Sequence, residues 1–245
     1  HQAEGHSYRT VRDRATWIDE PGRRLVTMPR PRVSFDKQLA ELDSMLLEMG
    51  REAESMLKNA LKALEERDVE LADRTIAHDD VVDRLRVDVE RTAIRLIATQ
   101  QPAAKDLRRI FASIAMDIER VGDYSLDICK AAKRLAARPL FKPLIDIPRM
   151  EQMVVKMLKQ ALDGFVTRDL DLIKRMIESD DEVDGLYKYL HEELCGFMKQ
   201  DPGLVDQAVQ LIVIARNLER IADHITNIGE RVCYVETGEL IELHE

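Results

Sequence analysis

Aromatic side chains are scarce in this sequence, at 4% of its 245 residues, and glycine and proline number only 10 and 8. A sheet fold uses aromatic residues in its strands and turn residues at short intervals, so this composition disfavours every sheet architecture. Leu, Ala, Met and charged residues are abundant instead, and these residues form helices most readily. We therefore expect an all-α protein, and the 45% of apolar residues suffice for a large core.

Long apolar runs are also missing. The most compact one, Leu211–Ala215, is far too short to cross a bilayer, and the N-terminal residues lack the apolar segment of a signal peptide. The three cysteines are odd in number and widely spaced, which is typical of a reducing compartment without a disulfide framework. These features predict a cytoplasmic protein.

Positive charge is in deficit, since the whole chain carries −9. The first 32 residues carry a net +3, so the rest of the chain carries −12. A body this acidic repels the phosphates of nucleic acids and the surfaces of anionic membranes. We expect no nucleic-acid partner, and contact with a membrane only through another protein.

Apolar residues recur at steps of three and four from Phe35 onward, which is typical of long helices packed in a bundle. The pattern predicts a first three-helix bundle over residues 33–137, with its third helix beginning at Pro102. The preceding residues 1–32 lack such a period and are expected to be an N-terminal extension, flexible or non-native, with Met28 as an alternative start.

Three prolines between residues 139 and 148 predict a short linker over residues 138–147. A second three-helix bundle is expected over residues 148–238, followed by a C-terminal tail over 239–245. Its second helix is predicted to begin near Asp169. Its last helix is predicted to open at Asp201, with the proline that follows as the first helical residue.

The two halves repeat each other. The segment that begins Asp79–Asp80 recurs 101 residues later as Asp180–Asp181, and the motif Glu-Arg-x-x-Asp recurs after 100 residues. Two tandem, duplicated three-helix bundles are the simplest fold that explains this repetition.

The repeated motifs place carboxylates four residues apart, so that they share one side of a helix. By counting about 100° per residue, the motif residues of the third and last helices point about 195° and about 170° away from their apolar seams. We therefore expect them to face outward. The first cluster consists of Asp79, Asp83, Glu119, Asp123 and Asp127, and the second cluster of Asp180, Asp184, Glu219, Asp223 and Asn227.

Dense carboxylates without intervening lysines indicate a metal site, because like charges stacked on a helix are unfavourable. Oxygen ligands suit Mg, Mn, Ca or ferric iron, and the lack of Cys or His pairs disfavours structural zinc. A di-iron oxidase is disfavoured too, since it needs Glu-x-x-His facing inward. The alternative is a solvated acidic face on a helical scaffold. Arg120 and Arg220 form surface ion pairs or bind an anion in either case.

No nucleophile motif, phosphate-binding glycine loop or H-E-x-x-H motif is present. The sequence therefore predicts a protein without enzymatic activity. The alternative from the enzyme class is a metal-dependent phosphoester hydrolase that uses the same two clusters.

From Met28 to Val235 the chain resembles the PhoU family, the regulatory proteins of the phosphate-specific transport system. Met49–Gly50 in the first helix contributes to this resemblance, and Tyr124 departs from it, because the family often has His there. Four further motifs complete it: Phe35-Asp-x-x-Leu39, Gln101-Pro102-x-Ala-x-Asp106-Leu-Arg108, Glu119-Arg120-x-Gly-Asp123 and Arg216-Asn217-x-Glu219-Arg220-Ile-Ala-Asp223-His224-x-x-Asn227.

The resemblance implies two three-helix bundles, no catalysis, and metal bound at the surface by E/D-x-x-x-D motifs, here the residues of the first and second clusters. The metal expected is Fe, Mn, Mg or Zn. The resemblance further implies negative regulation of phosphate-starvation signalling. The expected partners are a sensor histidine kinase and the ATPase subunit of the phosphate ABC transporter, and the expected assembly is a homodimer.

Overall fold

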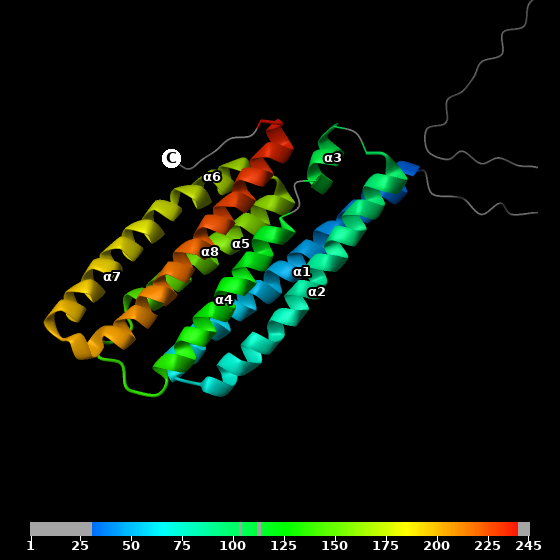
Figure 1. The fold of residues 1–245 in the computed structure, drawn as a ribbon. Helices are drawn as coiled ribbons and strands as arrows, with labels where there is room; N and C mark the ends of the chain where they lie inside the picture. Colours follow the sequence, from blue (N-terminus) through cyan, green and yellow to red (C-terminus); the bar gives the residue numbers. More distant parts are fainter. Residues whose placement is uncertain (1–30, 103, 112–113, 240–245) are drawn as a thin grey trace, which may run out of the picture.

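A computed structural model describes residues 31–102, 104–111 and 114–239, and the regular elements in these ranges are all helices (Figure 1). The predicted all-α fold is thus confirmed. The helices are α1 (Pro31–Glu66), α2 (Val69–Gln100), α3 (Ala104–Phe111), α4 (Ala115–Leu135), α5 (Asp146–Thr167), α6 (Leu170–Glu178), α7 (Asp180–Gln200) and α8 (Val205–Thr237), with a short 3₁₀ turn, η1 (Pro202–Leu204), before α8.

The first half is built from α1, α2 and α4, which pack on one another as an elongated bundle. The apolar stripe that begins at Phe35 forms its centre, and Met49, Met56 and Leu57 are fully buried there. The second half repeats this plan with α5, α8 and the pair α6 and α7, which together take the place of one long helix. The duplication predicted from the sequence motifs is therefore a duplication of three-helix units.

The two halves lie against each other. Figure 1 shows α7, α8, α4 and α2 side by side across the view, and α1 and α5 pack against this row. The main contact between the halves joins α4 to α8, and a second contact joins α1 to α5. Gly50 lies at this second contact, where an added Cβ would come 2.6 Å from a methyl carbon of Leu162. A side chain at position 50 would therefore hold α1 away from α5.

Two equivalent aspartates start the second helix of each half. The Asp68 carboxylate accepts a hydrogen bond from the Leu71 N–H at 2.9 Å, and the Asp169 carboxylate accepts one from the Leu172 N–H at 2.9 Å. Each satisfies one of the free N–H groups at a helix start. The predicted helix start near Asp169 is confirmed.

The predicted start of the third helix at Pro102 is wrong. Gln101 ends α2 in the left-handed conformation, with φ 48°, and α3 begins only at Ala104. The expected single helix is divided into α3 and α4, and Figure 1 shows α3 set apart from the axis of α4. The prediction for Asp201 is right in part. Its side chain accepts from the Gly203 N–H at 2.8 Å, but it caps η1, and α8 follows from Val205.

The other sequence boundaries fall near helix ends. α1 already begins at Pro31, inside the expected extension, whose residues 1–30 lie outside the described part of the chain. The segment between α4 and α5 corresponds to the predicted proline-rich linker. No helix in the described ranges combines the length and the apolar character needed to cross a membrane.

Candidate functional site

The first cluster lies between α2 and α4, which pack side by side. Burial is the largest cause that raises the pKa of Asp79, to about 6, and the charges of Asp83, Asp123, Asp80 and Glu119 raise it further. Neighbouring charges shift a carboxylate pKa most strongly from within roughly 4–6 Å. The structure therefore brings together Asp79, Asp83, Glu119 and Asp123 as the sequence motifs predicted.

Asp127 lies apart from this group and is exposed, one turn beyond Asp123 on α4. Its carboxylate accepts a hydrogen bond from Lys130 at 2.9 Å, one turn away on the same helix. Since Asp127 is not among the charges that shift the pKa of Asp79 or Glu119, its place in the first cluster remains a prediction from the motif.

The acids of the first cluster have cationic partners, against the expectation of uncompensated carboxylates. Arg86 on α2 places its Nε 2.9 Å from Glu119, and Arg120 places its Nη1 2.9 Å from Asp123. Burial raises the pKa of Glu119, Arg86 opposes this increase, and Asp123 and Asp83 reinforce it. The cluster is thus a network of half-buried or exposed acids that repel one another, two of which, Glu119 and Asp123, pair with arginines at its edge.

The backbone of α4 approaches the first cluster closely. An added Cβ at Gly122 would lie 3.5 Å from the Asp79 carboxylate and 3.6 Å from Val82. Because glycine has no side chain, position 122 leaves space beside the Asp79 carboxylate.

The second cluster lies between α7 and α8 and is deeper. Burial is the largest cause that raises the pKa of Glu219; Asp223 and Asp184 raise it as well, while Arg216 and Arg220 lower it. Glu219 is only 8% exposed, so the predicted outward orientation is wrong for this residue. It forms an ion pair with Arg216, and its second carboxylate oxygen, Oε2, is buried without a hydrogen-bond partner among the described residues.

The remaining members of the second cluster differ in burial. Asp180, the first residue of α7, is also buried. Asp184 and Asp223 are half-buried and lie 3.8 Å from Lys188 and Arg220. Asn227 is half-buried one turn beyond Asp223 on α8.

The clusters do not form a complete metal site in their present rotamers. Across residues 31–102, 104–111 and 114–239, no three His, Cys, Asp or Glu side chains are placed to hold an ion together. Arginines fill the positions beside the carboxylates instead. A metal at either cluster therefore needs these side chains to turn away.

Several residues at the site were not assigned a role from sequence. Arg86 pairs with Glu119, and its sequence signal is a spacing of three from Asp83. Arg216 pairs with Glu219 and opens the last family motif, which gave it no role. Asn217 is buried two residues before Glu219.

A polar bridge lies between the two halves. The Asp117 carboxylate on α4 is 4% exposed and contacts two α8 side chains, the His224 Nδ1 at 3.1 Å and the Arg231 Nε, which donates at 2.7 Å. The rings of Tyr124 and His224 meet beside it, with centroids 5.7 Å apart. His224 therefore takes part in the contact between the halves, which its position in the motif did not reveal.

Two duplicated helical units, each with acids from two helices gathered beside its core, define a class of all-α proteins with paired carboxylate clusters. The repeats match the family described as PhoU domain over residues 46–132 and 147–232, and the chain belongs to this family.

Relatives support this assignment along most of the chain. The phosphate-specific transport system accessory protein PhoU homolog of Clostridium acetobutylicum is 39% identical over 214 residues, which cover 86% of this chain and 98% of that protein. The homolog of Aquifex aeolicus is 38% identical over 208 residues, or 84% and 94% of the two chains. The crystal structure of PhoU from Pseudomonas aeruginosa has a TM-score of 0.81 and 32% identity, covering 84% of this chain and all of that one.

Proposed function

We propose that this protein is a non-enzymatic regulator of phosphate uptake that restrains phosphate-starvation signalling when phosphate is plentiful. It works in the cytoplasm as a homodimer through contacts with a sensor histidine kinase and with the ATPase subunit of a phosphate ABC transporter. The observation that carries the proposal is family membership in both repeats, together with relatives that are named accessory proteins of the phosphate-specific transport system.

We further propose that each cluster binds a metal ion, namely Fe, Mn, Mg or Zn. Two observations favour a cation at these places. The pKa of Asp79 is raised to about 6 by burial and by neighbouring acids, and Glu219 has a buried oxygen without a partner among the described residues. A cation relieves both, because it neutralises the repulsion and supplies the missing contact.

The donor set matches this proposal. It consists of carboxylate oxygens with one amide, Asn227, and hard cations prefer such ligands. The bound metal would supply positive charge that links α2 to α4 and α7 to α8. The protein surface on either side then has a fixed shape that a partner can recognise.

The metal proposal is tested by elemental analysis of the protein purified without chelators or a metal-affinity column. We expect stoichiometric metal in the wild type and its loss in Asp123→Ala/Asp223→Ala. Asp88→Ala is the matched control, because Asp88 is an exposed aspartate of α2 outside the cluster. Equal metal content in all three proteins would contradict the proposal.

The regulatory proposal is tested in cells. Deletion of the gene should derepress phosphate-uptake genes in phosphate-rich medium, and the wild-type gene should restore repression. Unchanged expression after deletion would overturn the proposal. Turnover of a phosphoester that the double variant abolishes would instead favour the metal-dependent hydrolase.

A further inference from the structure

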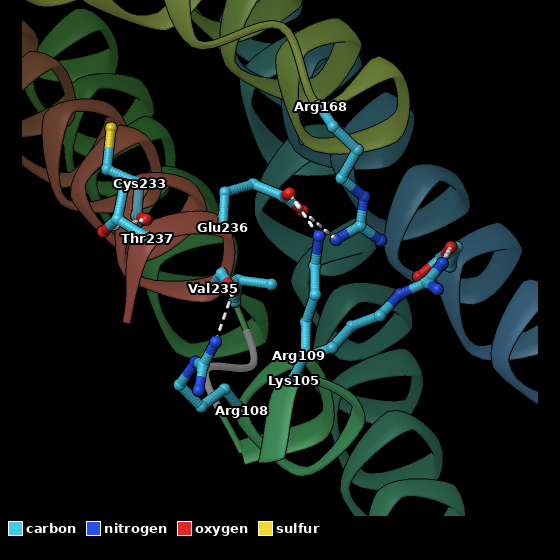
Figure 2. Close-up of polar contacts among 9 residues, drawn as sticks. Lys105, Arg108, Arg109, Arg168, Cys233, Val235, Glu236 and Thr237 are labelled. Atoms are coloured by element: carbon cyan, nitrogen blue, oxygen red, sulfur yellow. Dashed lines mark hydrogen bonds and ion pairs between the residues drawn. The ribbon is translucent and has the colours of Figure 1, made fainter. Parts of the chain in front are cut away.

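A basic corner that the proposed function does not use lies where α3 meets the second half (Figure 2). Its four cations come from two segments: Lys105, Arg108 and Arg109 from α3, and Arg168 from the turn between α5 and α6. Lys105, Arg108 and Arg168 contact the C-terminal end of α8, and the Arg109 side chain extends away from it toward α1 (Figure 2). A cavity of about 380 Å³ opens there, lined by Lys105, Asp106, Arg109, Val166, Arg168 and Glu236.

One carboxylate holds two of these cations together. Glu236 near the end of α8 accepts from Arg168 Nη1 at 3.0 Å, and its other oxygen pairs with Lys105 (Figure 2). Burial acts to raise the pKa of Glu236, but the hydrogen bonds from Lys105 and Arg168 outweigh it and lower the pKa. Glu236 is therefore ionised at neutral pH and keeps both cations at the cavity.

The cations of the cavity carry more donors than their protein partners use. One ammonium and two guanidinium groups present ~13 N–H donors, against the six oxygens of Glu236, Asp43 and Asp106, the last of which also lines the cavity. Arg109 pairs with Asp43 of α1, yet its Nε is buried without a hydrogen-bond partner in the described part of the chain. Lys105, Arg109 and Arg168 can thus bind a further acceptor.

Arg108 has a different role in the same corner. Its Nη2 donates to the Val235 carbonyl at 3.3 Å, and its guanidinium lies against Gly238, the residue that ends α8. A cation at this place satisfies free carbonyls and complements the negative end of the helix dipole. Arg108 therefore anchors α3 to α8. The three cations at the cavity, Lys105, Arg109 and Arg168, are not needed for this anchoring.

We propose that the basic corner binds a small, doubly charged oxyanion, either inorganic phosphate or a phosphoryl group on a peptide, with Arg109, Arg168 and Lys105 as its ligands. Guanidinium groups bind such oxyanions in a bidentate manner, through two parallel N–H···O hydrogen bonds. The Glu236 carboxylate alone does not use all the donors of these side chains. Because α3 belongs to the first half and Arg168 to the second, the bound anion links the two halves. None of the carboxylates of the first and second clusters lines this cavity, so the inference is independent of the metal proposal.

The test is a titration of the full chain with inorganic phosphate after chelator treatment, followed by calorimetry and by ³¹P NMR line widths. We expect saturable binding that weakens roughly tenfold in Arg168→Gln and further in Arg168→Gln/Arg109→Gln. Arg84→Gln is the matched control, because Arg84 is an exposed arginine of α2 that does not line this cavity, and it should bind like the wild type. The cluster variant Asp123→Ala/Asp223→Ala should also bind phosphate, which separates this result from the metal result.

A second series uses a phosphoserine peptide and its unphosphorylated form, and tighter binding of the phosphopeptide than of inorganic phosphate assigns the site to a modified partner. Far-UV circular dichroism and thermal unfolding check the fold of each variant. If an arginine variant fails to fold, Lys105→Gln replaces it, because that side chain is 55% exposed. Absence of saturable binding of both probes to the wild type, or equal binding by folded cavity variants, would overturn the proposal.

Discussion

At the scale of single residues, Asp79 is an acid that the folded protein ionises less readily than the unfolded chain does. Burial, followed by the charges of Asp83 and Asp123, raises its pKa from 3.8 to about 6. In the unfolded chain the same group loses its proton near pH 4. The folded state therefore binds more protons between about pH 4 and 6, so the free energy of unfolding falls as the pH rises through this window. Above about pH 6 the folded protein carries the full loss of stability that comes from ionising Asp79.

The substitution Asp79→Asn removes this cost. We expect it to raise the free energy of unfolding of the chelator-treated protein by about 1 kcal/mol at neutral pH, a value discounted for partial exposure, and to change it little at pH 4. Urea denaturation at the two pH values measures the difference. Asp88→Asn on the same helix should change stability by less than about 0.5 kcal/mol at either pH. An equal gain at both pH values for Asp79→Asn would contradict the assignment of its pKa.

The sequence predicted two groups of acids but misjudged the burial of Glu219 in the second one. The angular count takes one apolar seam as the buried side of a helix and assigns all its other sides to solvent. This assumption holds only for a helix that packs on one side. α8 packs against α5 and α7 and also against α4, so it has a second buried face. Asn217, two turns before His224, lies on the side of α8 that meets α4, whereas Glu219 is buried on the side that faces α7, beside Asp184. The position of a second packed face depends on the other half of the molecule and is not encoded in local periodicity.

At the scale of helices, α6 depends on its N-terminal cap. The Asp169 side chain accepts from the Leu172 N–H at 2.9 Å, and α6 is only 9 residues long. A short helix has little other local support, since its first N–H groups have no partner within the helix. The cap is therefore a large part of what stabilises the start of α6.

We expect Asp169→Ala to lower the free energy of unfolding by about 1 kcal/mol, the usual value of such a cap. Thermal and urea unfolding measure it, and Asp169→Asn should lose less because its amide oxygen still accepts the hydrogen bond. Asp171→Ala is the control, since this acid lies in the first turn without capping it. If Asp169→Ala and Asp171→Ala were equally destabilising, the loss would come from the charge near the helix start and the cap assignment would be wrong.

The division between α3 and α4 was not predictable from sequence. Apolar positions continue with a helical period across the break. The late start of α3 was equally hidden, because the left-handed residues before it, Gln101 and Ala104, with φ of 48° and 44°, are not the glycines that usually mark such positions. The contacts that direct α3 come from far along the chain: Arg108 donates to Val235, and Lys105 pairs with Glu236. Tertiary contacts thus override a local pattern that favours one continuous helix.

At the scale of the whole molecule, the two copies of the repeat meet through equivalent positions. Tyr124 and His224 are 100 residues apart in the repeat and contact each other. Asp117 precedes Tyr124 by as many residues as Arg231 follows His224, and Asp117 contacts Arg231. The two helices α4 and α8 therefore run antiparallel, about a local two-fold axis. The sequence predicted the duplication, but its motifs contained no sign of how the halves pack. The bridge exists in one copy only, because Asn217 replaces the aspartate in the other.

The contribution of this bridge can be measured. We expect Asp117→Ala to lower the free energy of unfolding by about 2 kcal/mol, less than the 3–5 kcal/mol of a fully buried pair, because the Arg231 side chain is 42% exposed and remains hydrated. Urea denaturation measures the loss, and Asp127→Ala, which removes an exposed acid of the same helix, should cost less than about 0.5 kcal/mol. A double-mutant cycle with Arg231→Ala should give a coupling energy of about 1 kcal/mol. Additive losses within about 0.3 kcal/mol would mean that the ion pair between Asp117 and Arg231 does not help to hold the halves together.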